Sequence, residues 1–268
     1  MPLLVWIILF TAIGGLLSAL AASTFLVVPE SLRARVLPHL VSFATGALLS
    51  AALLGLLPHA IESAGTADAH YIGMTLLCGL LVFFVLEKLV LWRHCHQELC
   101  EGHVPHDHGS DHGHSHANRD AASASLILIG DGFHNVLDGV LIAAAFMTDV
   151  HLGVVTAIAV TAHEIPQEVG DLAILLHGGM SRARALTLNL LTSVTSVVGG
   201  IVAYFLLADV TRLLPYALAI AASSFLYIAV ADLIPGLHRR VDPGSGFKQF
   251  VFIVLGVVVI YFSHSIAH

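Results

Sequence analysis

Two short stretches of the sequence place imidazole, carboxylate and amide side chains within otherwise apolar segments. They read DGFHNVLD from Asp131 to Asp138 and HEIPQEVGD from His163 to Asp171. Ionisable groups in hydrocarbon are costly, and they persist there when they pair with one another or work together. We therefore expect these two stretches to carry the function of the protein.

Helical spacing brings the polar side chains of each stretch together. Residues four apart share a helix face, which pairs His134 with Asp138 beside Asn135, and then His163 with Gln167 and Glu164 with Glu168. The loop between the two helices is short, so the helices must pack antiparallel as neighbours. Their facing polar surfaces would offer nitrogen and oxygen donors, a mixed set that suits Zn²⁺ or Fe²⁺ better than Ca²⁺ or Mg²⁺.

The composition identifies the elements that must position these residues. Hydrophobic residues make up 57% of the 268 residues and charged residues 11%, and the mean hydropathy is +0.89. Soluble domains are about 25% charged, so the sequence predicts an integral membrane protein. Continuous apolar runs of about 20 residues suit membrane helices rather than the alternating strands of a barrel. The expected fold class is all-α, with eight transmembrane helices at about 3–27, 36–60, 70–92, 123–147, 152–177, 182–207, 211–234 and 247–266.

Basic residues fall in alternate loops, which predicts the orientation. One set of loops and helix ends carries Arg33, Arg35, Lys88, Arg93, Arg119, Arg182, Arg184, Arg239, Arg240 and Lys248, whereas the other set carries Arg212 alone. Positive residues mark the cytosolic side, so both termini are expected on the non-cytosolic side. We interpret residues 1–268 as a single transmembrane domain.

One long loop, at about 93–122, is rich in histidine. It holds His94, His96, His103, His106, His108, His112, His114 and His116 among Gly, Ser and Asp. Such a segment has no apolar face to bury, so we expect a disordered cytosolic loop. Two interpretations stay open, since imidazoles could collect divalent metals there, or the loop could be a solvated linker.

Three further polar residues lie in or beside other spans, namely His59, Asn189 and Asp232. Each is either a metal ligand or a structural residue that hydrogen-bonds within the helix bundle. The structural interpretation fits a single isolated residue better than it fits the many polar groups of the fourth and fifth spans.

The HNxxD and HExPxExGD motifs, the eight spans and the histidine-rich third loop resemble the ZIP (Zrt/Irt-like) family of divalent metal transporters. The resemblance covers essentially the whole chain. It implies a 3+2+3 arrangement, in which spans one to three and six to eight form inverted repeats around the four–five hairpin, and it implies metal movement into the cytosol. Transported Zn²⁺, Fe²⁺, Mn²⁺ or Cd²⁺ would be substrate, and no catalytic cofactor is expected.

The resemblance also implies a set of site residues. A primary site would use His134, Asp138, His163 and Gln167 with His59 nearby, and an adjacent second site would use Asn135, Asp138, Glu164 and Asn189. Glu168, Asp171 and Asp232 would be accessory, with Asp232 on the exit route. The departure is Gln167, where relatives often have histidine or glutamate, because a neutral amide oxygen is a weaker ligand.

Two other functions compete with this interpretation. HExxH marks zinc metalloproteases, but the fifth position here is Gln167, so the second imidazole is missing and we expect no enzyme activity. A cation-efflux carrier would also pair intramembrane His and Asp, but the span count and the proline-centred motif favour uptake. The expected partners are divalent metal ions and the lipid bilayer, with a homodimer as one open assembly and no nucleic acid. The expected location is a bacterial inner membrane.

Overall fold

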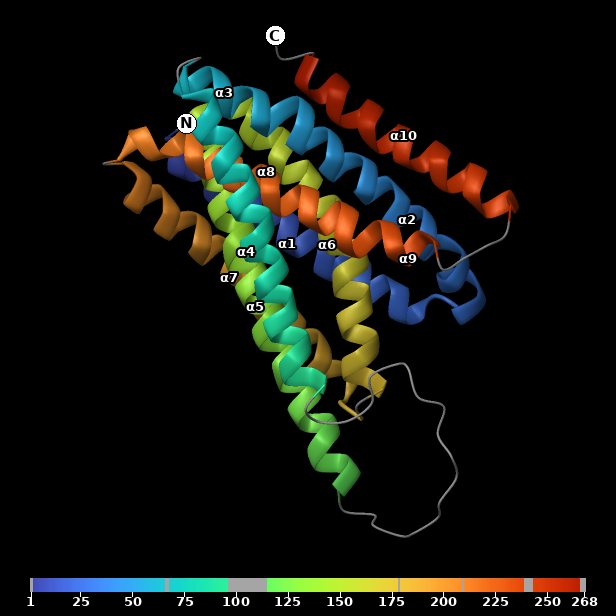
Figure 1. Cartoon of the computed structure of the whole chain (residues 1–268). Helices are drawn as coiled ribbons and strands as arrows, with labels where there is room; N and C mark the ends of the chain where they lie inside the picture. Colours follow the sequence, from blue (N-terminus) through green and yellow to red (C-terminus); the bar gives the residue numbers. More distant parts are fainter. Residues whose placement is uncertain are drawn as a thin grey trace.

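The computed structural model describes residues 2–65, 68–95, 115–177, 179–208, 210–238 and 243–265, and all regular structure in these ranges is helical. The all-α expectation is therefore confirmed (Figure 1). The helices are α1 (Leu3–Val27), α2 (Glu30–Ser50), η1 (Ala51–Leu56), α3 (Leu57–Ala64), α4 (Ala69–Cys95), α5 (Ser115–Thr148), α6 (Val150–His177), α7 (Arg182–Ala208), η2 (Thr211–Leu213), α8 (Leu214–Tyr227), η3 (Ile228–Leu233), α9 (Ile234–His238) and α10 (Pro243–Ser265).

Within the described ranges, seven helical segments are long and apolar enough to cross a membrane. They are Leu3–Phe25, Ser31–Ala64, Ala69–Lys88, Leu128–Thr148, Arg182–Ala208, Thr211–His238 and Gly246–Ser263. The remaining predicted span is α6, which is long enough at 28 residues. It is not among the seven because polar residues such as His163, Glu164 and Gln167 lower its hydropathy.

Helices occupy both ends of the loop that was predicted at 93–122. α4 continues to Cys95 and α5 begins at Ser115, so both ends of that loop are helical and the expectation was wrong there. Alanine is the best helix former, and Ala117, Ala121 and Ala122 help α5 to extend beyond its apolar part. His94 and His116 lie within these helices, whereas His96, His103, His106, His108, His112 and His114 lie outside the described residues.

Two membrane segments contain a wide π-helical turn at matching positions. α2, η1 and α3 form one continuous ribbon, as do α8, η3 and α9 (Figure 1). The N–H of Leu57 donates to the carbonyl of Ala52, and the N–H of Ile234 donates to that of Ala229, each five residues back. Proline follows directly in both cases, at positions 58 and 235. Because proline has no N–H and crowds the preceding turn, it favours the wider turn.

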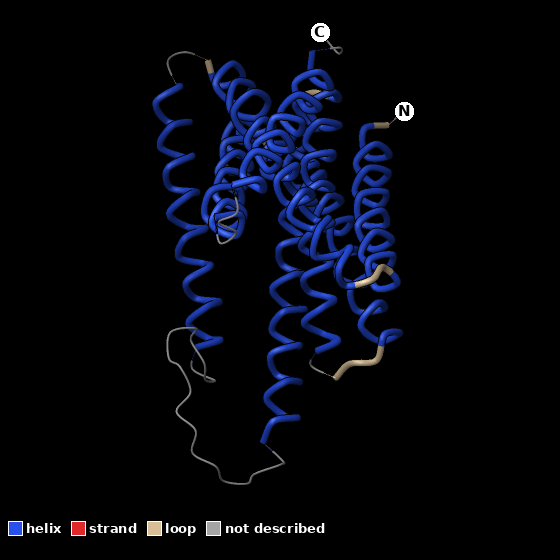
Figure 2. The backbone as a smooth tube through the Cα atoms, turned by 90° about the vertical axis from the view of Figure 1, so that its right-hand side faces the viewer, coloured by secondary structure: helices blue, strands red, loops and turns tan. Residues whose placement is uncertain are grey.

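Close helix contacts at glycine hold the bundle together. A Cβ on Gly139 of α5 would overlap the carbonyl of Ser196 in α7, and a Cβ on Gly199 would overlap that of Val136. Gly46 and Gly256 join α2 to α10 in the same manner. Small residues allow membrane helices to approach this closely, so these contacts fix α5 against α7. Figures 1 and 2 show α1 beginning and α10 ending at the same end of the bundle.

Candidate metal centre

Four side chains from the α5–α6 hairpin converge at one point inside the bundle. They are His134 and Asp138 of α5 and His163 and Glu164 of α6, and one ligand atom of each lies within 4.8 Å of all the others. Asp138, His163 and Glu164 are buried, and the His134 side chain is 22% exposed. Among the described His, Cys, Asp and Glu residues, this is the one group with such spacing.

The distances between the ligand atoms fit a small tetrahedral ion. The Nε2 atoms of His134 and His163 lie 3.1 Å apart. Each lies 3.3 to 3.7 Å from a carboxylate oxygen of Asp138 and of Glu164. Tetrahedral zinc with bonds of about 2.0 to 2.2 Å requires ligand atoms about 3.3 to 3.6 Å apart. The imidazole–imidazole and imidazole–carboxylate distances are therefore already close to the spacing that zinc requires.

The two carboxylates of this cluster are buried without hydrogen-bond partners. All four oxygens of Asp138 and Glu164 are buried, and none accepts a hydrogen bond. The nearby imidazole nitrogens lie within 4 Å without hydrogen-bond geometry to them. A buried ionised carboxylate without a partner is strongly unfavourable. The arrangement is therefore suited to a bound cation.

The backbone orients one of the imidazoles. Nδ1 of His163 lies 3.3 Å from the carbonyl oxygen of Ala159, one turn earlier in α6. A proton on Nδ1 can be donated to this carbonyl, which leaves the lone pair of Nε2 directed at the cluster. A hydrogen bond from Nδ1 to this carbonyl would favour the tautomer of His163 that can bind a metal through Nε2.

A second polar layer from α5, α6 and α7 adjoins the cluster. The amide of Asn135 donates to the side chain and carbonyl of Asp131 at 3.0 and 3.2 Å. Ser193 of α7 donates to Glu168 at 2.7 Å, and the other carboxylate oxygen of Glu168 has no partner. Asn189, one turn before Ser193, is buried with both side-chain polar atoms unpartnered. This layer contains polar groups that lack partners, as the first cluster does.

Two members of this layer were not assigned a site role from the sequence, although Asp131 begins the first polar stretch. Asp131 lies four residues before Asn135, and Ser193 lies four residues after Asn189. Extending the helical spacing by one turn in each span would have identified both. A serine among membrane residues is common, so its role required the packing of α6 on α7 to be known.

His59 lies apart from the four converging residues. Its Nδ1 is 2.9 Å from the carbonyl oxygen of Gly55, and its charge acts on Asp149 at the start of α6. Partial burial of Asp149 opposes ionisation, but hydrogen bonds from the N–H groups of Leu152 and His151 prevail and lower its pKa. His163 lies 14 residues beyond Asp149, which is about 21 Å along a helix.

The other expected residues occupy three positions around the cluster. Gln167 and Asp171 are half-buried on α6, one and two turns beyond His163. Asp232 is exposed on the wide turn η3, and its charge acts on His134 and His163. The second half of α6 and the η3 turn thus add polar groups around the four converging residues.

Comparison with known proteins identifies relatives over most of the chain. The family model described as ZIP Zinc transporter matches residues 3–121 and 93–264. "Zinc transporter zipt-7.1" of Caenorhabditis briggsae is 31% identical over 317 residues, covering 96% of this chain and 78% of the relative. "Zinc transporter YKE4" of Saccharomyces cerevisiae is 30% identical over 250 residues, covering 82% of this chain and 68% of the relative. Human "Zinc transporter ZIP10" is 36% identical over 182 residues, which cover 64% of this chain but 21% of the relative.

Proposed function

The chain belongs to the ZIP zinc transporter family, and from this membership we propose that it carries zinc into the cytosol through His134, Asp138, His163 and Glu164. The observation that carries the proposal is the group of two imidazoles and two buried, unpartnered carboxylates whose ligand atoms lie within 4.8 Å of one another. Asn135, Gln167 and Asn189 are proposed as further ligands near this centre, with Glu168, Asp171 and Asp232 accessory.

The proposed topology has eight spans, with α6 as the fifth, in the 3+2+3 arrangement. α6 packs against α1, α2, α5, α7 and α10, and a helix surrounded by others can carry polar residues at membrane depth. The matching π-helical turns in the second and seventh spans support inverted repeats, because interrupted segments at corresponding positions characterise such transporters. The common end of α1 and α10 supports termini on one side.

The names of the relatives support zinc, whereas Fe²⁺, Mn²⁺ and Cd²⁺ stay predictions from the ligand chemistry. A bacterial inner membrane and a homodimer also stay predictions, and the three relatives named above come from eukaryotes.

Direction of transport is the direct test of this function. In cells that express the protein in the plasma membrane, external zinc should raise the signal of a cytosolic zinc indicator within minutes. Cells carrying the empty vector and cells given Mg²⁺ are the controls. A cation-efflux carrier would instead lower the cytosolic signal in zinc-loaded cells, and that result would contradict the proposal.

Gln167 is expected to set selectivity. It supplies a neutral amide where imidazole would bind borderline metals more strongly, so Gln167→His should raise the affinity for Zn²⁺ relative to Mn²⁺. One added imidazole contact of about 1.4 kcal/mol should lower the KM for zinc by about tenfold. Because a carrier must also release its cargo, we expect the maximal rate to be equal or lower. Competition of Mn²⁺ and Cd²⁺ with zinc uptake would measure the change. Unchanged competition in a well-folded variant would show that residue 167 does not face the metal.

A further inference from the structure

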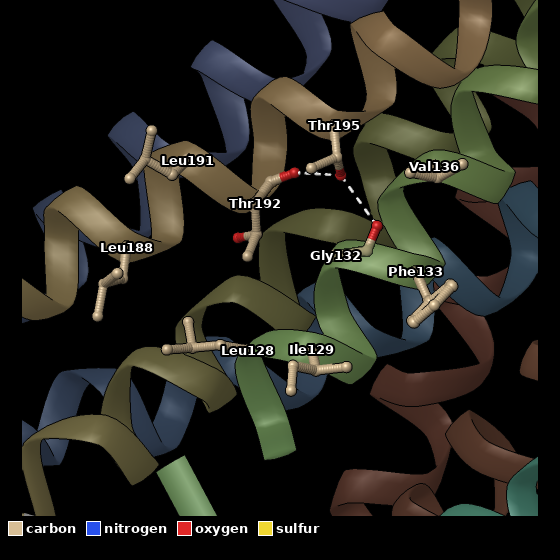
Figure 3. A pocket seen from close by; sticks show the side chains of 9 residues that line it. All are labelled: Leu128, Ile129, Gly132, Phe133, Val136, Leu188, Leu191, Thr192 and Thr195. Carbon is tan, nitrogen blue, oxygen red and sulfur yellow. Dashed lines mark hydrogen bonds between the residues drawn. The ribbon is translucent and has the colours of Figure 1, made fainter. Parts of the chain in front are cut away.

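An apolar groove lies between α5 and α7 on the outer surface of the bundle. It has a volume of about 360 Å³, and apolar side chains of both helices line it, among them Ile129, Phe133, Leu188 and Leu191. Figure 3 shows Leu188 and Leu191 of α7 on one side and Ile129 and Phe133 of α5 on the other. Ile129, Phe133 and Leu191 are 57%, 71% and 58% exposed, so the groove opens outward at membrane depth.

The groove exists because α5 and α7 diverge on the N-terminal side of their close contact at Gly139. At Gly139 the helices touch so closely that a Cβ would overlap the Ser196 carbonyl. Two turns earlier, a Cβ on Gly132 would meet only the methyl of Thr192, at 3.9 Å. The hydroxyl of Thr195 bridges the gap by hydrogen bonds to the carbonyls of Gly132 and Thr192 (Figure 3). The Thr192 hydroxyl donates to the carbonyl of Asn189, so both threonine hydroxyls are occupied and the walls that remain are apolar.

A positive charge lies at the end of this groove. Arg184, Leu188, Leu191 and Thr195 follow one another at spacings of four, three and four residues, so they share one face of α7. Arg184 is exposed, and the first turn of α7 contains no acidic residue to neutralise it. A long arginine side chain at the end of a membrane helix extends its charge to the headgroup region.

We propose that this groove holds an acyl chain of an anionic phospholipid whose headgroup lies on Arg184. The apolar walls fit the chain, and the exposed guanidinium fits the phosphate. Arginine binds phosphate with paired hydrogen bonds, and cytosolic leaflets are rich in anionic lipid. The lipid would fill the gap between the helices that carry Asn135 and Asn189, and so would stabilise α5 against α7. This proposal holds whichever metal is transported and in whichever direction.

Native mass spectrometry of the metal-free full chain in detergent tests the binding. Phosphatidylglycerol and phosphatidylcholine with identical acyl chains are the probes. We expect the wild type to retain phosphatidylglycerol preferentially, and Arg184→Gln to weaken that binding about fivefold, the effect of about one basic residue near an anionic headgroup. Leu191→Trp should fill the groove and reduce binding of both lipids. Thermal unfolding should show that phosphatidylglycerol stabilises the wild type more than either variant.

Two matched controls make the result specific. Arg182→Gln removes an equal charge from another face of α7, and Val202→Trp adds an equal ring at a 49% exposed position three turns beyond Leu191. Both should bind phosphatidylglycerol as the wild type does. Equal retention of the two lipids by the wild type, or equal losses in Arg182→Gln and Arg184→Gln, would overturn the proposal. Full displacement of phosphatidylglycerol by glycerol phosphate would also overturn the proposal. A lipid-free dimer that Leu191→Trp dissociates would overturn it as well, because the groove would then be an interface between copies.

Discussion

Asp138→Asn is expected to abolish zinc transport and at the same time to stabilise the metal-free protein. The Asp138 carboxylate is buried beside the Glu164 carboxylate, and neither of its oxygens accepts a hydrogen bond. An amide of the same shape removes its charge. Removing one of two adjacent buried carboxylate charges relieves their mutual repulsion, and this should raise the free energy of unfolding by about 1 to 3 kcal/mol in the absence of metal. Zinc should stabilise the wild type by about 2.7 kcal/mol at a hundredfold excess over Kd, and this gain should be lost in the variant. Thermal unfolding with and without zinc, together with flux, measures all three effects.

A loss of zinc transport together with a gain in stability would distinguish a loss of metal binding from a general folding defect. Asp149→Asn is the matched control, because Asp149 accepts a hydrogen bond from the N–H of Leu152 at the start of α6 and asparagine is an equally good helix cap. It should keep wild-type flux and zinc stabilisation. If Asp138→Asn transports zinc at the wild-type rate, or if zinc stabilises it fully, the carboxylate does not bind the cargo.

Gly139→Ala is expected to give the largest loss of stability of any single methyl addition in α5. The new Cβ would overlap the Ser196 carbonyl, which is backbone and cannot rotate away, so α5 and α7 would have to separate. Overpacking of this kind costs about 1 to 3 kcal/mol, and a backbone contact belongs at the upper end. Thermal unfolding and the monodisperse fraction after extraction from the membrane should both fall.

Gly132→Ala is the matched control for this packing effect. It adds the same methyl to the same helix where the nearest atom is the Thr192 methyl at 3.9 Å. Alanine is a better helix former than glycine by about 1 kcal/mol, so the variant should be as stable as the wild type or more so. Equal destabilisation by both substitutions would mean that the α5–α7 contact is not tight at Gly139.

The lengths of the apolar runs were enough to predict the helices. The run expected at 182–207 is the helix Arg182–Ala208, and the run at 3–27 is Leu3–Val27. Hydropathy does not show where a helix ends once its sequence becomes polar, so the extension of α5 back to Ser115 was missed. Conversely, α6 shows that a helix of spanning length can carry polar residues that lower its hydropathy.

The candidate site was predictable where it depends on local spacing. The convergence of His134, Asp138 and His163 follows from residues four apart on two helices joined by a short loop. The partner of Glu168 could not be identified in this way, because Ser193 lies 25 residues further along the chain, on α7. Binding of metal by these residues stays a prediction.

The wide turns η1 and η3 have a mechanical consequence. Each holds one residue more than an α-helical turn, and moving that extra residue by one position rotates the intervening segment by about 100° and shifts it by about 1.5 Å. η1 lies in the second half of the membrane segment Ser31–Ala64, which begins beside Arg33. η3 lies in the second half of the segment Thr211–His238. The bundle therefore contains two wide turns at which a membrane segment can rotate and shift without any change in loop length.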